Sequence, residues 1–158
     1  IKWVFSMEIS DFLQNDAVVT LRASSKKQVL QDLSRHAKAL TGLNDGTIFE
    51  VLLEREKLGS TGVGKGVAIP HGKLRGLSSL QGIFAKLDKP IDFDSVDNSP
   101  VDLVFLLLAP EQAGADHLKA LATVSRHLRD KDNCDKLRGA QGHDGLYILL
   151  TQKEAQAA

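Results

Sequence analysis

The sequence predicts an α/β domain in which helices flank a sheet on both faces. Apolar residues recur at helical spacing in the first and last thirds of the chain, whereas the middle third holds short apolar runs separated by glycine and proline. The most apolar run, residues 101–108, is nearly continuous, which is typical of a strand in the middle of a covered sheet. Helices first, strands in the middle and helices last favour a layered α/β domain.

The first helix is expected after a short valine-rich run at residues 17–21. Ser25 and Gln28 have the spacing of a capping box, in which two side chains satisfy the free N–H groups at the start of a helix. Gly42 is the expected stop. Between these ends, four apolar residues share one helical stripe: Val29, Leu33, Ala37 and Leu40.

A second helix is predicted to open after Asp45, and Gly59 is expected to supply its left-handed exit. One stripe of this helix carries Ile48, Val51, Leu52 and Arg55. Arg55 is therefore expected near the last turn, facing the segment that follows.

The middle of the chain begins with residues 59–66, which hold four glycines in eight positions. So many glycines cost too much entropy inside a helix or strand, so a loop is expected there. Residues 67–69 are predicted to be a short strand ended by Pro70. Further strands are expected at residues 82–87, 91–93 and 101–108.

The last third is predicted to be helical again. A helix is expected to start at Asp116 or its neighbours, and two more at residues 130–137 and 144–153. The stripe predicted for the first of these helices consists of Leu118, Leu121, Val124 and Leu128.

Composition excludes several classes of protein. The 158 residues include 20 basic and 20 acidic side chains, so the chain lacks the net positive charge that would favour nucleic-acid binding. A local basic patch is still an open alternative. The longest apolar run, at residues 101–110, is about half of the ~20 residues that a membrane span needs, so no membrane insertion is expected. The single cysteine, Cys134, excludes an internal disulfide and fits a reducing cytoplasm.

The first six residues precede the only methionine, Met7, and are too few for a secretory signal. We expect residues 1–6 to be a remnant of cloning or processing, and the natural protein to begin at Met7. A single domain is then expected over residues 7–158.

The glycine-rich segment resembles two nucleotide-binding motifs and satisfies neither. Gly59, Gly64 and Lys65 match the P-loop spacing, but Gly66 stands where a serine or threonine should hold magnesium. The segment also follows a helix and opens a strand, the reverse of a P-loop. A dinucleotide fingerprint would need a glycine where Val67 stands.

His71 is the most marked candidate for chemistry. Pro70 fixes the backbone before it, and Gly72 is expected to leave space after it for an incoming group. A glycine-rich loop before it, including Gly64 and Gly66, would let another macromolecule approach closely. Neutral imidazole is a competent nucleophile when the proton on its other nitrogen is held by an acceptor. The alternative is that His71 only caps a turn.

The other histidines are less marked. His36 and His127 lie beside arginines and are expected on solvated helix faces, and His143 belongs to a polar turn. His117 is expected in the first turn of a helix, where backbone N–H groups favour an anion. No histidine or cysteine spacing typical of a metal site occurs, and no metal or cofactor is expected.

The sequence TGVGKGVAIPHGK at residues 61–73 closely resembles the active-site signature of fructose/mannitol-type enzyme IIA domains of the bacterial phosphotransferase system, and among them the nitrogen-related enzyme IIA. Three further blocks occur in the family's order and spacing: PIDFD at 90–94, PVDLVFLLLAP at 100–110 and DHLKALA at 116–122. The resemblance implies an α/β sandwich with a mixed sheet.

The resemblance also implies a phosphotransferase in which His71 takes a phosphoryl group, on Nε2, from the histidine of an HPr-like carrier. The family's active-site arginine matches Arg55 and its second histidine matches His117. A guanidinium can donate two hydrogen bonds to phosphate oxygens. Lys73 is a weaker candidate, for the field at the phosphate or for docking, and Lys65 is expected to be a solvated loop residue.

The resemblance favours the nitrogen-related branch, because the ending Pro-His-Gly-Lys is closer to that type. Such proteins are regulators whose phosphorylation state acts on partners such as transporters or sensor kinases. Two alternatives stay open: a sugar-specific IIA that passes phosphate to a IIB domain, and an interaction module that kept the fold and lost the chemistry.

Overall fold

The computed structural model describes residues 7–152, and the expectation about residues 1–6 lies outside them. Two short 3-10 helices, η2 (Ile9–Asp11) and η3 (Asn15–Ala17), lead into strand β1 (Val18–Leu21). The predicted valine-rich run is thus a strand. It pairs in parallel with β5 (Gln81–Ile91), far along the chain.

Helix α1 (Lys26–Thr41) begins and ends where its capping residues predict. The Ser25 hydroxyl accepts a hydrogen bond from the Gln28 N–H at 3.2 Å, and Gly42 ends the helix with a left-handed φ of 76°. The Gln28 side chain accepts from the N–H of Ser24 at 2.9 Å, so the box closes one residue earlier than expected.

Helix α2 (Asp45–Lys57) is capped by Asn44, whose side chain accepts from the N–H of Thr47 at 2.9 Å. The N–H groups of Leu58 and Gly59 close a tight final turn. Gly59 then leaves the helix with a positive φ of 148°, a conformation that favours glycine, as predicted for the exit.

The glycine-rich segment is only partly a loop, which corrects the prediction for residues 59–66. Strand β2 (Gly62–Gly64) and strand β3 (Val67–Ala68) form an antiparallel hairpin. Both residues between the strands have positive φ, 57° at Lys65 and 83° at Gly66, as in the type I′ turns that fit the twist of a hairpin. The glycines therefore permit a tight turn.

The sheet is mixed and is built around β6 (Val101–Pro110). The strand order is β1-β5-β6-β3-β2, and β4 (His71–Leu74) also pairs with β6, beyond β3. β5 runs antiparallel to β6, whereas β3 and β4 run parallel to it. The separate strand predicted at residues 91–93 is wrong, because a register irregularity after Lys86 brings Ile91 into β5 opposite Val101.

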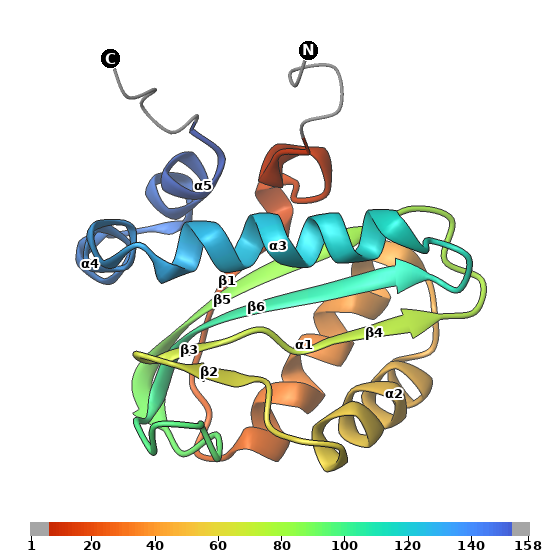
Figure 1. Ribbon diagram of the computed structural model, residues 1–158, viewed down its shortest axis with the longest axis horizontal. Coiled ribbons are helices and arrows are strands. Elements are labelled where there is room, and N and C mark those ends of the chain that lie inside the picture. The colour runs from red at the N-terminus through yellow and green to blue at the C-terminus, as the bar shows by residue number, and fades with distance from the viewer. Residues whose placement is uncertain (1–6, 153–158) are drawn as a thin grey trace.

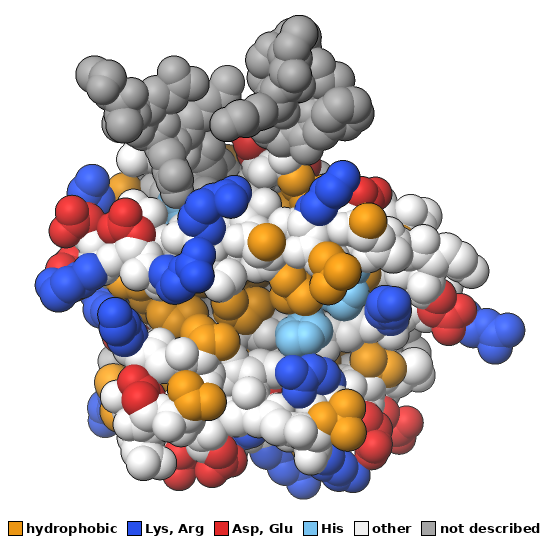
Figure 2. Space-filling model, viewed as in Figure 1, with side chains coloured by type: hydrophobic (Ala, Val, Ile, Leu, Met, Phe, Trp, Pro, Cys, Tyr) orange, Lys and Arg blue, Asp and Glu red, His pale blue; other side chains and the backbone are white. Residues whose placement is uncertain are grey.

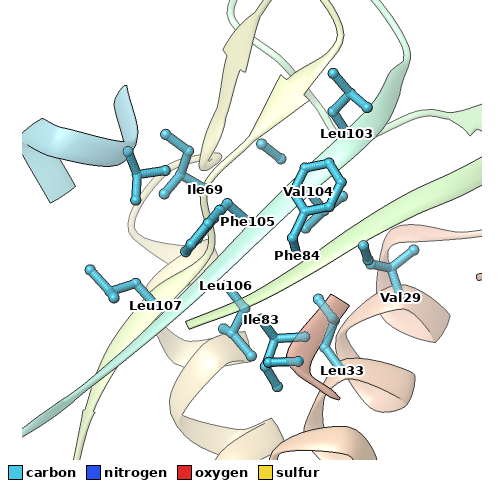
Figure 3. Packing of buried hydrophobic residues seen from close by; sticks show 14 of the residues in the cluster. Val29, Leu33, Ile69, Ile83, Phe84, Leu103, Val104, Phe105, Leu106 and Leu107 are labelled. Carbon is cyan, nitrogen blue, oxygen red and sulfur yellow. The ribbon is translucent and has the colours of Figure 1, made fainter. Parts of the chain in front are cut away.

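Helices cover both faces of this sheet, as predicted (Figure 1). α1 lies behind the sheet in this view and α3 (Ala115–Arg129) crosses in front of it, followed by α4 (Lys131–Gly139) and α5 (His143–Thr151). β6 is buried along nearly its whole length, as expected for a central strand. Its side chains pack with those of β5 and α1 in the core shown in Figure 3, where Phe84, Phe105 and Leu33 are labelled.

The predicted apolar stripe of α3 is partly wrong. Leu118 is 70% exposed, and the prediction that His127 lies on a solvated face also fails because His127 is buried. Val124 and Leu128 lie on the inward face of the helix, and positions 117, 120 and 127 share that face at helical spacing. Leu118 is rotated by about 100° around the helix axis from His117 and so points away from this face. The buried residues of this helix are His117, Ala120, Val124, His127 and Leu128.

Candidate active site

His71 is placed by an interruption in the edge of the sheet. β3 and β4 continue along the same side of β6, with His71 opposite Leu107, and the two strands are separated by Ile69 and Pro70. Pro70 has no N–H to donate, but its carbonyl accepts from the N–H of Leu107 at 3.0 Å, so the chain stays on β6. His71 therefore opens a strand, where the sequence placed it at the end of one.

The hydrogen bonds of His71 define its tautomer. Nδ1 lies 2.8 Å from the carbonyl oxygen of Ile69, which can only accept, so Nδ1 carries the proton. Nε2 accepts a hydrogen bond from Nε of Arg55 at 3.3 Å. The unprotonated nitrogen, with its lone pair, is thus Nε2, and the ring is held in the form that a nucleophilic histidine needs.

Arg55 comes from the last turn of α2, as the helical stripe predicted. Its Nη1 donates to the carbonyl of Gly59 at 2.8 Å, in the turn that ends the helix. The guanidinium is therefore fixed at one end to the backbone of its own element and reaches His71 with the other.

Gly72 explains how α2 comes so close to β4. A Cβ at this position would lie 2.6 Å from Cγ1 of Val51 on α2, well inside normal contact. The sequence suggested that Gly72 leaves space for an incoming group, but the direction of its missing side chain is filled by Val51. The absence of a side chain at Gly72 allows the approach that brings Arg55 to His71.

His117 lies in the first turn of α3 and completes the group. Its ring centroid is 5.8 Å from that of His71, at an interplanar angle of 69°. The residue is 7% exposed, and its Nε2 makes no hydrogen bond with any of the described residues. A buried ring nitrogen beside His71 is thus available to a further group.

These residues line an open hollow of about 370 Å³. Figure 2 shows histidine surfaces in the middle of the displayed face, beside Lys and Arg side chains and apolar patches. Lys73 belongs to the lining, whereas Gly64 and Gly66 do not. The full lining is Val51, Glu54, Arg55, Leu58, His71, Gly72, Lys73 and His117.

Burial and nearby positive charge lower the pKa of both histidines, which favours their neutral forms. Burial lowers the pKa of His71 below its ordinary value of 6.5, and the charge of Arg55 lowers it further, although the Ile69 carbonyl and Glu56 act in the opposite direction. The pKa of His117 is lowered by burial, by His71 and by Lys73. The Nε2 lone pair of His71 is therefore available below the pH at which an exposed histidine would be protonated.

The hairpin that carries Gly64 and Gly66 lies apart from the hollow and is held from two sides. Asp97 accepts from the N–H of Lys65 at 2.9 Å, and Nη2 of Arg138 donates to the Lys65 carbonyl at 3.0 Å. Arg138 also pairs with both carboxylate oxygens of Asp102 on β6. Lys65 itself is exposed, as expected.

Two features of the site were missed by sequence reasoning. One is the Ile69 carbonyl, which no sequence motif can indicate because it is a backbone atom. The other is Glu56, a buried carboxylate next to Arg55. The sequence offered one signal for Glu56: it is a charged residue in the predicted helix, directly beside the candidate Arg55. Among residues 7–152 there is no group of three or more His, Cys, Asp or Glu side chains that could hold a metal ion.

Helices in the described part of the chain are too short or too polar to cross a membrane.

Residues 11–153 match the family model described as phosphoenolpyruvate-dependent sugar phosphotransferase system, EIIA 2. A nitrogen regulatory protein of Bradyrhizobium diazoefficiens is 56% identical over 96% of this chain and 100% of its own, and the one from Escherichia coli is 40% identical over 94% and 93%.

Solved structures agree with the sequence relatives. The crystal structure of nitrogen regulatory protein IIA-Ntr from Neisseria meningitidis has a TM-score of 0.86 and 34% identity, over 90% of this chain and 99% of that one. The mannitol IIA of Escherichia coli, 18% identical over 87% and 98%, shares the fold with a TM-score of 0.73. The chain therefore belongs to the EIIA 2 family of the phosphotransferase system, in its nitrogen regulatory (IIA-Ntr) branch.

Proposed function

We propose that His71 accepts a phosphoryl group on Nε2 from the phosphohistidine of an HPr-like carrier, and that the phosphorylation state regulates partner proteins. The observation that carries this proposal is the tautomer: Nδ1 donates to Ile69, which leaves the Nε2 lone pair in a hollow lined by cationic side chains. No cofactor is required, because phosphoryl transfer depends mainly on positioning and on charge stabilisation.

The transfer step exchanges one N–P bond for another. The bond between phosphorus and the carrier's histidine breaks and its electron pair stays on that imidazole, while the Nε2 lone pair of His71 forms the new bond. The Nδ1 proton stays on His71, hydrogen-bonded to Ile69. Nε of Arg55 loses its acceptor when Nε2 is phosphorylated, and it then donates to a phosphate oxygen.

His117 and Lys73 would assist this step from the other side of the hollow. The buried Nε2 of His117, without a partner among the described residues, would donate to a second phosphate oxygen if it carries the ring proton. Lys73 is exposed and adds positive charge at the rim. We assign Gly72 to helix packing within this machinery.

The regulatory reading rests on the relatives and on charge. Three relatives that are at least 40% identical, each matched over 92% or more of its own length, are named nitrogen regulatory proteins. A phosphoryl group adds close to two negative charges to a hollow lined by Arg55, Lys73 and Glu54, so the net charge of this lining changes from positive to negative. Transporters and sensor kinases are the proposed targets, and the cytoplasm, where the free thiol of Cys134 is stable, is the proposed location.

Incubation with enzyme I, an HPr-like carrier and phosphoenolpyruvate tests the acceptor. We expect a mass increase of one phosphate that is labile in acid and stable in base, lost in His71→Ala and kept in the matched control His36→Ala on α1. Absence of phosphate from the wild-type protein, or its retention in His71→Ala, would contradict the proposal.

Affinity capture tests the regulatory role. Partners bound by the unphosphorylated protein, the phosphorylated protein and His71→Asp are compared by mass spectrometry. Capture that changes with phosphorylation supports a regulator. Capture that is the same in all three states favours an interaction module, and transfer of phosphate to a IIB domain favours a sugar-specific IIA.

A further inference from the structure

Glu56 is the one buried carboxylate near the active site among the described residues, and the mechanism above does not use it. It follows Arg55 in the last turn of α2, and its side chain is only 4% exposed. A buried carboxylate must be paired to offset the cost of leaving water. Its partners therefore indicate what it holds in place.

The Glu56 carboxylate ties the end of α2 to the start of β2. It accepts from the N–H of Thr61, at 3.1 Å to the nearer oxygen, and from the Thr61 hydroxyl. These bonds close residues 57–60 into a short loop whose two ends are fixed. The carbonyl of Gly59 lies inside that loop.

Lys26 holds the carboxylate from α1. Its Nζ lies 2.7 Å from Oε2 of Glu56, and it also donates to the Phe93 carbonyl at 3.4 Å. Ser60, inside the closed loop, donates to the same Phe93 carbonyl at 2.6 Å. The loop is thus bonded to the segment at Phe93, and the carboxylate that closes it is bonded to α1.

The closed loop matters because of what Arg55 must do during transfer. One of its two hydrogen bonds, from Nε to Nε2 of His71, is lost when that nitrogen forms its bond to phosphorus. The other bond, from Nη1 to the carbonyl of Gly59 at 2.8 Å, is then the remaining anchor of the guanidinium within the protein. The position of that carbonyl decides where the guanidinium meets the phosphate.

We infer that Glu56 is a positioning residue for phosphoryl transfer, which acts through the Gly59 carbonyl on Arg55. This inference rests on the proposed acceptor role of His71. Glu56 does not line the hollow and does not touch the phosphate. Its negative charge also raises the pKa of the His71 imidazole, which provides a second readout.

The test compares Glu56→Gln with the wild-type protein in single-turnover transfer from a phosphorylated HPr-like carrier. Glutamine keeps an oxygen for Thr61 but loses the ion pair, and Lys26 keeps Asp94 at 3.5 Å. We expect transfer to slow by between about 10- and 100-fold, as for a misplacement of roughly 1 Å. Glu50→Gln, an exposed charge on the same helix, is the matched control and should transfer at the wild-type rate.

A double-mutant cycle with Arg55→Ala identifies the route of the effect. If Glu56 acts through Arg55, then Glu56→Gln should have little further effect once Arg55 is alanine. In ¹⁵N NMR titrations, Glu56→Gln should lower the pKa of His71 while Nδ1 stays protonated. A loss of packing alone would not produce this combination.

Thr61→Val provides a second variant if Glu56→Gln fails to fold, since it removes the hydroxyl donor and keeps the shape. We expect the same direction with a smaller loss. Wild-type transfer in both folded variants, or equal losses from Glu56→Gln with and without Arg55, would overturn the inference. Failure of the wild-type protein itself to accept phosphate would instead overturn the proposed function.

Discussion

Gly72→Ala should separate α2 from β4 and so disturb the site without touching a reacting group. The new Cβ would lie 2.6 Å from Cγ1 of Val51, whereas carbon atoms in contact are normally about 3.5 to 4.0 Å apart, so a shift of roughly 1 Å is required. Overpacking of this kind costs about 1–3 kcal/mol. The same shift would move Arg55 relative to His71 and slow transfer by about 100-fold.

The assay pairs urea unfolding with single-turnover transfer from the phosphorylated carrier. Gly139→Ala is the control, because nothing lies within 4 Å of a Cβ there, and it should leave the transfer rate unchanged. Adding Val51→Ala to Gly72→Ala removes the clashing methyl group and should recover most of the rate. The reasoning is refuted if Gly72→Ala transfers and unfolds like the wild-type protein, or if Val51→Ala recovers nothing.

Two further predictions concern the charges around His71. Arg55→Ala should slow transfer by at least about 100-fold, the usual loss of a donor aimed at a reacting oxygen, with a wild-type unfolding curve; unfolding of the variant would instead indicate a structural role. Because burial lowers the pKa of His71, the decline in transfer rate with falling pH, caused by protonation of Nε2, should be centred below 6.5. A decline centred at 6.5 or higher would contradict this sign.

Local signals in the sequence predicted much of the fold. The caps Ser25 and Gly42 mark the two ends of α1 because they satisfy backbone groups within one turn. The continuous apolar run of β6 marks the central strand because a strand buried on both faces does not alternate apolar with polar residues. The glycine-rich hairpin was harder to predict. Its turn depends on positive φ at Lys65, a residue that rarely adopts it, held there by Asp97 and Arg138 from distant segments.

The sequence predicted side chains that the structure brings together, His71, Arg55 and His117, but not the contacts that hold them in place. The helical stripe placed Arg55 at the end of α2, and the family signature marked His71. The support by Glu56 depends on a contact with Thr61 and Lys26 that no periodicity encodes. The predicted buried stripe of α3 was wrong at one position because it was chosen by hydrophobicity, which favoured Leu118. The structure instead buries the neighbouring His117.

The most direct test of the central claim is to identify which nitrogen carries the phosphate. Protein labelled with ¹⁵N at histidine is phosphorylated by the carrier, and the N–P coupling is measured by NMR. Because Nδ1 of His71 is held by the Ile69 carbonyl and Nε2 opens to the hollow, we expect phosphorus on Nε2 of His71. Phosphorus on Nδ1, or on His117, would contradict the proposed mechanism.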